Sequence, residues 1–165
     1  MDQAAGRTAL AWIVALLDEA GIPFQVAGGV AAAAFGARRD VADIDLYVPA
    51  AYLPRLMRLV GPDRIIEQPW RHRDASWDLI VMALEHGGQR IEVGVAEAAR
   101  YRDRVSGAWC DASIDFGASV PHAVWGVAVP VMPRLQLIDT KRRIDREVDR
   151  RDLVEIDDPA SSSSP

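Results

Sequence analysis

The segment from Asp43 to Val48 (DIDLYV) sets two acids into a short apolar run, and it constrains the possible fold more than any other part of the chain. Successive side chains of a β-strand point to opposite faces, so Asp43 and Asp45 would leave one face about 6 to 7 Å apart while Ile44 and Leu46 enter the core. Aspartate is disfavoured in strands, and adjacent like charges repel. This placement is costly unless hydrogen bonds or a cation such as Mg²⁺ offset it.

Short apolar strands alternate with helical segments along the chain, which predicts one α/β domain over residues 1–156. We expect helices over residues 7–20, 30–35, 50–60 and 133–148, and strands over residues 24–27, 44–48, 64–67, 77–84, 89–95 and 127–132. Gly87-Gly88 should close a hairpin, residues 69–74 should form an exposed loop, and a helix is expected near Arg100. Residues 157–165 (DDPASSSSP) cannot bury apolar surface and should form a disordered tail.

The composition excludes several classes of protein. The 165 residues carry a formal net charge of −5, which argues against broad, salt-dependent binding of nucleic acid. No apolar stretch approaches the roughly 18 residues needed to cross a bilayer, and the first residues lack the order of a secretory signal. The single cysteine, Cys110, allows neither an internal disulfide nor a cysteine-based zinc site. We expect a cytoplasmic protein without membrane contact; the sequence leaves its oligomeric state open.

A third acid is expected from the second strand of the hairpin. Apolar residues alternate over residues 89–95, so Glu92 points away from the core. Three carboxylates suit Mg²⁺ or Mn²⁺, which keep bound waters and bridge to substrate phosphates. Asp78 and Glu85 lie near the same hairpin and stay open as alternatives to Glu92.

Gly28-Gly29 lies between the apolar run 24–27 and an alanine-rich helical segment. The first turn of a helix presents free backbone N–H groups and the positive end of the helix dipole, both of which attract phosphate oxygens. The two glycines therefore predict a phosphate site close to the acids. A simple tight turn is the alternative interpretation.

The chain contains, in this order, an apolar strand, Gly-Gly, a small-residue helix, the basic pair Arg38-Arg39 and Asp-x-Asp on a strand. This order of elements resembles the DNA polymerase beta-like nucleotidyltransferase superfamily. Over roughly residues 8–156 the chain looks most similar to the small lincosamide and aminoglycoside nucleotidyltransferases and to the nucleotidyltransferase toxins. The resemblance implies a nucleotidyltransferase fold, an α/β fold with a mixed β-sheet flanked by helices. The chain departs from the superfamily pattern at Val30, where a serine often follows the glycine.

The resemblance also implies roles for individual residues. It assigns metal binding to Asp43, Asp45 and Glu92, and triphosphate binding to Gly28 and Gly29. Among the small members, the nucleotidyltransferase toxins have a C-terminal pattern similar to the sequence around Lys141.

Lys141 is the only lysine of the chain and falls in the last long predicted helix. Its ammonium could contact the triphosphate and stabilise negative charge on the leaving pyrophosphate. The alternative is that residues 141–151 form a solvated helix face with acid–base pairs three and four residues apart.

Together these features predict the transfer of a nucleoside monophosphate from a nucleoside triphosphate to an acceptor hydroxyl, with release of pyrophosphate. Asp43, Asp45, Glu92 and Lys141 would be the catalytic residues, and Glu92 is the candidate general base if one is needed. The acceptor could be a small molecule, RNA or a protein side chain. The alternative is a non-catalytic module that keeps the fold and binds a nucleotide or another protein.

Overall fold

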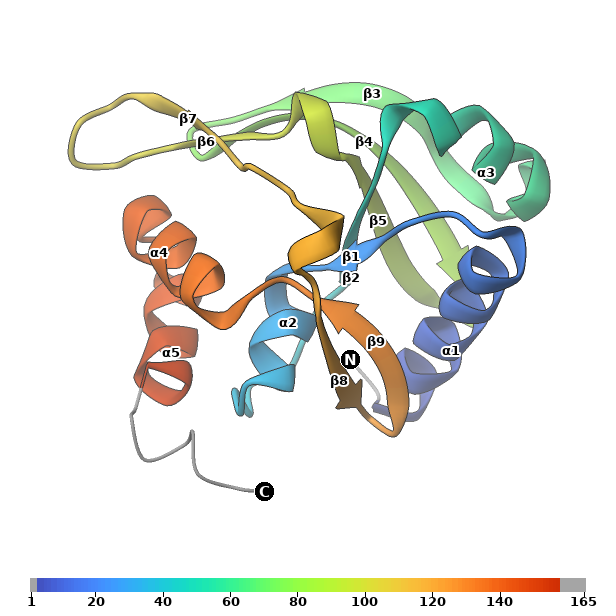
Figure 1. Ribbon diagram of the computed structural model, residues 1–165, viewed down its shortest axis with the longest axis horizontal. Coiled ribbons are helices and arrows are strands. Elements are labelled where there is room, and N and C mark those ends of the chain that lie inside the picture. Colours follow the sequence, from blue (N-terminus) through green and yellow to red (C-terminus); the bar gives the residue numbers. More distant parts are fainter. Residues whose placement is uncertain (1–2, 158–165) are drawn as a thin grey trace.

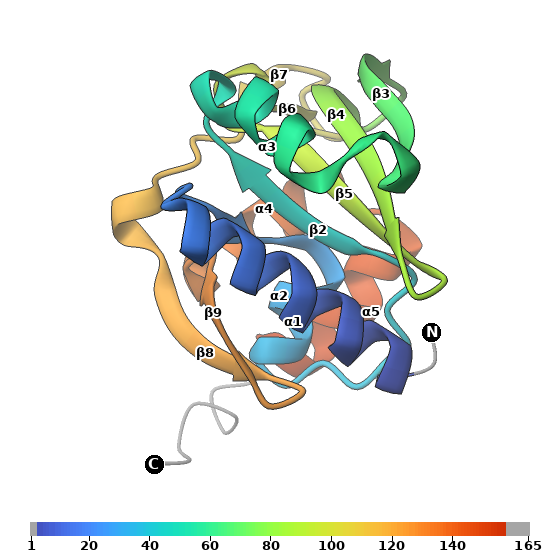
Figure 2. The same cartoon turned by 90° about the vertical axis from the view of Figure 1, so that its right-hand side faces the viewer.

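A computed structural model of the chain describes residues 3–157, which form a curled β-sheet with helices packed on both sides (Figures 1 and 2). The α-helices of this part are α1 (Gln3–Ala20), α2 (Gly28–Ala34), α3 (Leu53–Val60), α4 (Arg134–Ile144) and α5 (Glu147–Ile156). Its strands are β1 (Gln25–Val26), β2 (Ile44–Val48), β3 (Ile65–Arg73), β4 (Trp77–His86), β5 (Gln89–Val95), β6 (Arg100–Arg102), β7 (Trp109–Asp111), β8 (Val120–Val124) and β9 (Val127–Val131). Short 3₁₀ helices are η1 (Ala50–Tyr52), η2 (Pro62–Arg64), η3 (Ala96–Ala98) and η4 (Phe116–Ala118).

The strands follow the order β7-β6-β4-β5-β2-β1-β9-β8, and β3 pairs with the free side of β4. The pairs β2–β5 and β1–β9 are parallel, and the other pairs are antiparallel. Helix α1 packs against β4, β5 and β9, while α2, α4 and α5 contact one another on the other side of the sheet (Figure 1). The mixed sheet flanked by helices is therefore confirmed.

One part of the core lies between α1 and the sheet. Helix α1 buries Leu10, Ile13 and Leu17 completely, which are the positions that the helical spacing predicted. From the sheet, Leu84 and Ile91 are equally buried. These side chains place the hairpin β4–β5 firmly against α1, and the hairpin prediction is confirmed by its pairing from Val81 to His86. None of the helices within residues 3–157 is long and apolar enough to cross a membrane.

Two predictions for the middle of the chain are wrong. Residues 69–74 are not an exposed loop, because β3 runs from Ile65 to Arg73 as an edge strand paired with β4. The loop was predicted because of Pro69, which cannot donate a backbone hydrogen bond. Pro69 lies where the register between β3 and β4 shifts, and an edge strand tolerates a residue that donates no hydrogen bond to its neighbour. Arg100 begins the short strand β6 rather than a helix, since its backbone pairs with β4 and β7.

The predicted helix over residues 133–148 is also wrong in one respect, because it is interrupted. Helix α4 ends at Ile144, Asp145 adopts a left-handed conformation with φ of 55°, and α5 then starts in a new direction. Aspartate is one of the few residues that tolerates this region, and Arg104 donates a hydrogen bond to the Asp145 carbonyl. Of the predicted tail, residues 158–165 lie outside the described part of the chain.

Candidate functional site

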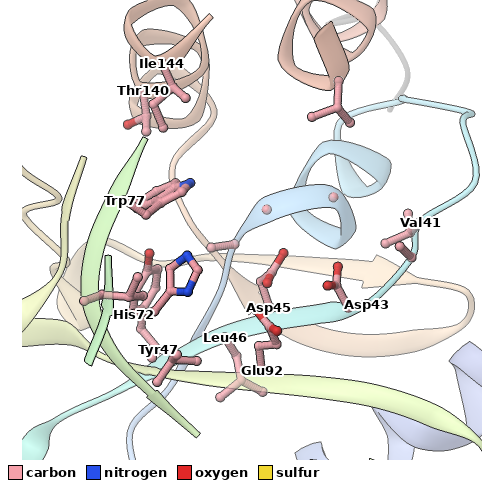
Figure 3. A pocket seen from close by; sticks show the side chains of 18 of the residues that line it. Val41, Asp43, Asp45, Leu46, Tyr47, His72, Trp77, Glu92, Thr140 and Ile144 are labelled. Atoms are coloured by element: carbon pink, nitrogen blue, oxygen red, sulfur yellow. The ribbon is translucent and has the colours of Figure 1, made fainter. Parts of the chain in front are cut away.

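Three carboxylates converge at the centre of the sheet (Figure 3). Asp43 lies in the bend before β2, Asp45 lies in β2, and the parallel pairing of β2 with β5 sets Asp45 directly beside Glu92. One oxygen from each of the three residues lies within 4.8 Å of the others. The structure thus brings together the three acids that the alternation of side chains predicted.

The positively charged side chains nearby do not fully offset the repulsion among the three acids. Burial, and then the charges of Asp43 and Glu92, raise the pKa of Asp45 to about 7, although the charges of Lys141 and Arg146 oppose the shift. Carboxylate oxygens at this spacing are the donors that a hard divalent cation prefers. The raised pKa and the all-oxygen donor set fit a Mg²⁺ or Mn²⁺ site.

The two alternative acids, Asp78 and Glu85, lie apart from this cluster of three carboxylates. Asp78 is buried on β4, where it accepts hydrogen bonds from Arg71 at 2.7 Å and from Arg100 at 2.5 Å. Arg71 foremost, and then Arg100, hold the pKa of Asp78 well below its usual range. Glu85 is exposed at the end of the hairpin. Glu92 is the acid of the hairpin that meets Asp43 and Asp45.

A cavity of about 540 Å³ opens above the acids, between the sheet and the helices α2, α4 and α5. The wall beside the acids is aromatic and contains Tyr47, His72 and Trp77, which lie to the left of the acids in Figure 3. Thr140 and Ile144 of α4 close it from above. The cavity therefore has an acidic half and a largely aromatic and apolar half.

The glycine pair forms the first turn of α2, directly against the acids. Gly28 has φ of 59°, and a Cβ at this position would lie 2.0 Å from Oδ2 of Asp45. A Cβ at Gly29 would lie 3.0 Å from both Arg39 and Val41. The N-cap residue of α2, Ala27, provides no side-chain cap. The site therefore requires glycine at Gly28 for close packing, and the first turn leaves its backbone open to the cavity.

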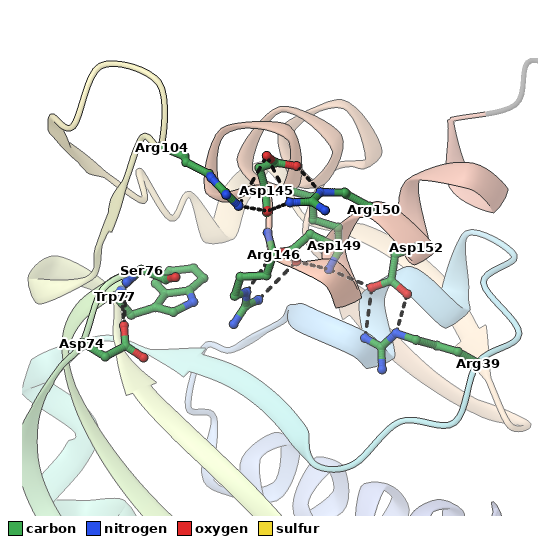
Figure 4. Close-up of polar contacts among 11 residues, drawn as sticks. Arg39, Asp74, Ser76, Trp77, Arg104, Asp145, Arg146, Asp149, Arg150 and Asp152 are labelled. Carbon is green, nitrogen blue, oxygen red and sulfur yellow. Dashed lines mark hydrogen bonds and ion pairs between the residues drawn. The ribbon is translucent and has the colours of Figure 1, made fainter.

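Lys141 is buried, not on a solvated helix face. Its ammonium contacts Asp149 at 3.1 Å and Asp152 at 2.8 Å, and the side chain is only 5% exposed. Asp152 also accepts from Arg39 at 2.5 Å, and Asp149 accepts from Arg146 at 2.8 Å (Figure 4). A continuous ion-pair network thus runs from Arg39, in the segment between α2 and β2, to Arg146 at the start of α5.

Arg90 is a residue of the site that the sequence reasoning missed. Its Nε donates to Glu92 at 2.9 Å, and its Nη2 donates to Glu67 at 2.8 Å. The alternation that selected Glu92 could have revealed it, because Arg90 lies two residues earlier on the same face of β5. Trp77 was missed as well, since nothing in the sequence indicates that β4 borders a cavity.

No family model and no curated protein matches the sequence. Solved structures do match the fold. A candidate nucleotidyltransferase of Thermotoga maritima superposes with a TM-score of 0.62 at 19% identity, covering 80% of each chain. The chain has the nucleotidyltransferase fold. The resemblance noted in the sequence is thus confirmed at the level of the fold.

Two further structures share the nucleotidyltransferase fold with this chain. The antibiotic-resistance factor ANT(2'')-Ia matches with a TM-score of 0.58 and 20% identity, covering 93% of this chain and 85% of its own. The lincosamide antibiotic adenylyltransferase LnuA, solved with lincomycin bound, matches with a TM-score of 0.60 and 12% identity, covering 90% and 94%. The match extends over most of each chain, so the fold is shared as a whole.

Proposed function

We propose that this protein transfers a nucleoside monophosphate from a nucleoside triphosphate, in a metal-dependent reaction, to a hydroxyl group of an acceptor. The observation that carries the proposal is the convergence of Asp43, Asp45 and Glu92 within 4.8 Å, on a nucleotidyltransferase fold and against the glycine turn of α2. Fold alone does not define an activity, but these side chains and their environment supply the chemistry.

Asp43, Asp45 and Glu92 would hold the divalent cation, Mg²⁺ or Mn²⁺. When bound, it would offset their repulsion and neutralise charge on the substrate phosphates during an in-line displacement. The raised pKa of Asp45 supports this assignment, because three adjacent carboxylates without a counter-charge are unfavourable. Arg90 donates to one oxygen of Glu92 and so fixes the orientation of that carboxylate.

The triphosphate would lie against Gly28 and Gly29, where the absence of side chains lets phosphate oxygens approach the backbone. Lys141 would add positive charge behind the same wall as part of the ion-pair network, without touching the phosphates itself. Charge of this kind, fixed before the substrate arrives, stabilises the negative charge that builds up on the departing pyrophosphate.

In the reaction, the acceptor oxygen forms a bond to the α-phosphorus while the bond from that phosphorus to the bridging oxygen breaks. Pyrophosphate leaves with that oxygen, and the proton of the acceptor hydroxyl passes to a base. Glu92 is the nearest candidate, because a carboxylate of the trio can accept a proton as the hydroxyl attacks. The cavity walls hold the two reactants in line, which removes much of the entropic cost of their encounter.

The acceptor is proposed to be a small molecule. ANT(2'')-Ia is described as an antibiotic-resistance factor and LnuA as a lincosamide antibiotic adenylyltransferase. Both descriptions favour a small-molecule acceptor, and that of LnuA also favours an adenylyl group as the group transferred. A cavity of about 540 Å³ has the size of ordinary small-molecule sites. ATP is therefore the first nucleotide to test.

Calorimetric titration of the protein with ATP and Mg²⁺, followed by incubation with α-labelled nucleotides and a panel of hydroxyl-bearing acceptors, tests the proposal. We expect binding, labelled product and pyrophosphate from the parent protein, and no product from Asp45→Asn. Asp40→Asn removes the same charge from an exposed position outside the cavity and should behave as the parent. Binding without pyrophosphate release from any acceptor would favour the non-catalytic module, and no binding of any nucleotide would refute both.

A further inference from the structure

Five charged side chains form the network that borders the cavity. Arg146, Asp149, Lys141, Asp152 and Arg39 alternate in sign along it, joined by contacts of 2.5 to 3.1 Å. Three cations and two anions leave one net positive charge. The question is which of the cations can present that charge to a phosphate group.

Lys141 is poorly placed to do so. Its ammonium has three donors, two of which are directed to Asp149 and Asp152, and its side chain is almost completely buried. Moving the ammonium toward a ligand would unpair two buried carboxylates, which is unfavourable.

Arg39 is also held within the protein. Its Nε and Nη2 donate to Asp152, and its Nη1 donates to the carbonyl of Asp40. Each of the three guanidinium nitrogens therefore has a partner within the protein.

Arg146 differs from both. Its Nε and Nη2 donate to Asp149 at 2.8 and 3.1 Å, and no hydrogen bond involves Nη1 among the residues that the structure describes. Its side chain is 43% exposed and lines the cavity. In Figure 4 the guanidinium extends from the start of α5 into the space between Trp77 and Arg39.

The backbone gives Arg146 this position. The left-handed conformation of Asp145 ends α4 and turns the chain so that Arg146 precedes the first turn of α5. The carboxylate of Asp149 binds both the backbone N–H and the guanidinium of Arg146, which keeps the side chain in one orientation. Arg146 and the three acids line the same cavity, so a ligand bound there can lie between them.

We propose that Arg146 is the cation that contacts the phosphates of the bound nucleotide, an inference that rests on the function proposed above. A guanidinium that lines the cavity, is held by one carboxylate and keeps Nη1 without a partner among the described residues can donate charge-assisted hydrogen bonds to a phosphate without first breaking its own ion pair. The negative charge of the phosphates then lies between the metal-binding acids on one side and Arg146 on the other.

The test is calorimetric titration of inorganic tripolyphosphate and, separately, of ATP, both with Mg²⁺. We expect Arg146→Ala to raise the dissociation constants of the two ligands by the same factor, about 10- to 100-fold. Arg146→Lys should give an intermediate value, because it keeps the charge and loses the fork. Arg150→Ala is the matched control, since Arg150 lies near the start of α5, four residues after Arg146, pairs with Asp145 and lies outside the lining of the cavity.

Thermal unfolding without ligand shows whether each variant is folded, and Arg146→Gln replaces the alanine variant if that one is not. Equal dissociation constants for Arg146→Ala and Arg150→Ala would overturn the inference and leave the proposed function untouched. Conversely, if the parent binds tripolyphosphate through Arg146 but binds no nucleotide, the phosphate contact of Arg146 stands, and the proposed function fails together with the nucleotide as its ligand. A parent protein that binds neither ligand refutes both.

Discussion

Replacement of Asp45 by asparagine should stabilise the metal-free protein while removing its proposed activity. Burial and the neighbouring carboxylates raise the pKa of Asp45 from 3.8 to about 7. The unfolded chain keeps a pKa near 3.8, so the folded state binds the proton more tightly, and ionisation of Asp45 opposes folding. Asparagine has nearly the same shape and no charge, so it relieves the repulsion without opening a cavity.

The expected gain in the free energy of unfolding follows from the size of the pKa shift of Asp45. A difference of about three pKa units corresponds to about 4 kcal/mol. Because Asp45 is only half-buried and solvent screens its charge, we expect about 2 kcal/mol. The difference in the free energy of unfolding between the variant and the parent should be complete above the folded pKa of about 7. It should decline as the pH falls toward 3.8 and disappear below it, where Asp45 is neutral in both the folded and the unfolded state.

Urea unfolding in the presence of EDTA measures this difference. The asparagine variant should show a higher free energy of unfolding than the parent at about pH 8 and nearly the same value at about pH 4. Added Mg²⁺ should stabilise the parent and leave the variant almost unchanged, because a ligand stabilises only the folded state that binds it. A variant no more stable than the parent at about pH 8, or a gap that does not depend on pH, would refute the electrostatic account of the three acids.

Two further substitutions test the surroundings of the acids. Lys141→Met should lower the free energy of unfolding by about 3 kcal/mol, because two buried aspartates lose a partner, whereas Arg142→Met at an exposed position should change it by less than about 0.5 kcal/mol. Equal losses in urea unfolding would mean that the buried network contributes little. Gly28→Ala should weaken nucleotide and Mg²⁺ binding in calorimetry, since its Cβ would meet the Asp45 carboxylate, and should destabilise the fold by at least about 1 kcal/mol. Gly36→Ala, with φ of 106° and open space around it, should show the backbone strain alone and normal binding.

Much of the fold could be predicted because it depends on local patterns. The strand over residues 44–48 and the strand over residues 89–95 have the predicted bounds, since alternation and the flanking proline and glycines define them. The edge strand β3 could not be predicted with the same rules. Its residues are mostly polar and include Pro69, and only pairing with β4 makes them extended.

The ends of the C-terminal helices depended on contacts that no local pattern contains. The segment from Arg134 to Val148 has the composition of one helix, yet a hydrogen bond from Arg104, some forty residues earlier, binds the Asp145 carbonyl at the break. That break is what brings Arg146 to the cavity.

The sequence by itself determined that Asp43 and Asp45 share a face, that Glu92 points away from the core, and that a glycine pair precedes them. Each of these follows from the geometry of a single strand or turn. Only the tertiary structure decided that Asp45 lies beside Glu92, because the register of the parallel strands β2 and β5 depends on how the whole sheet packs. It likewise decided that Lys141 is buried between two aspartates, since solvation of a helix face depends on what packs against it.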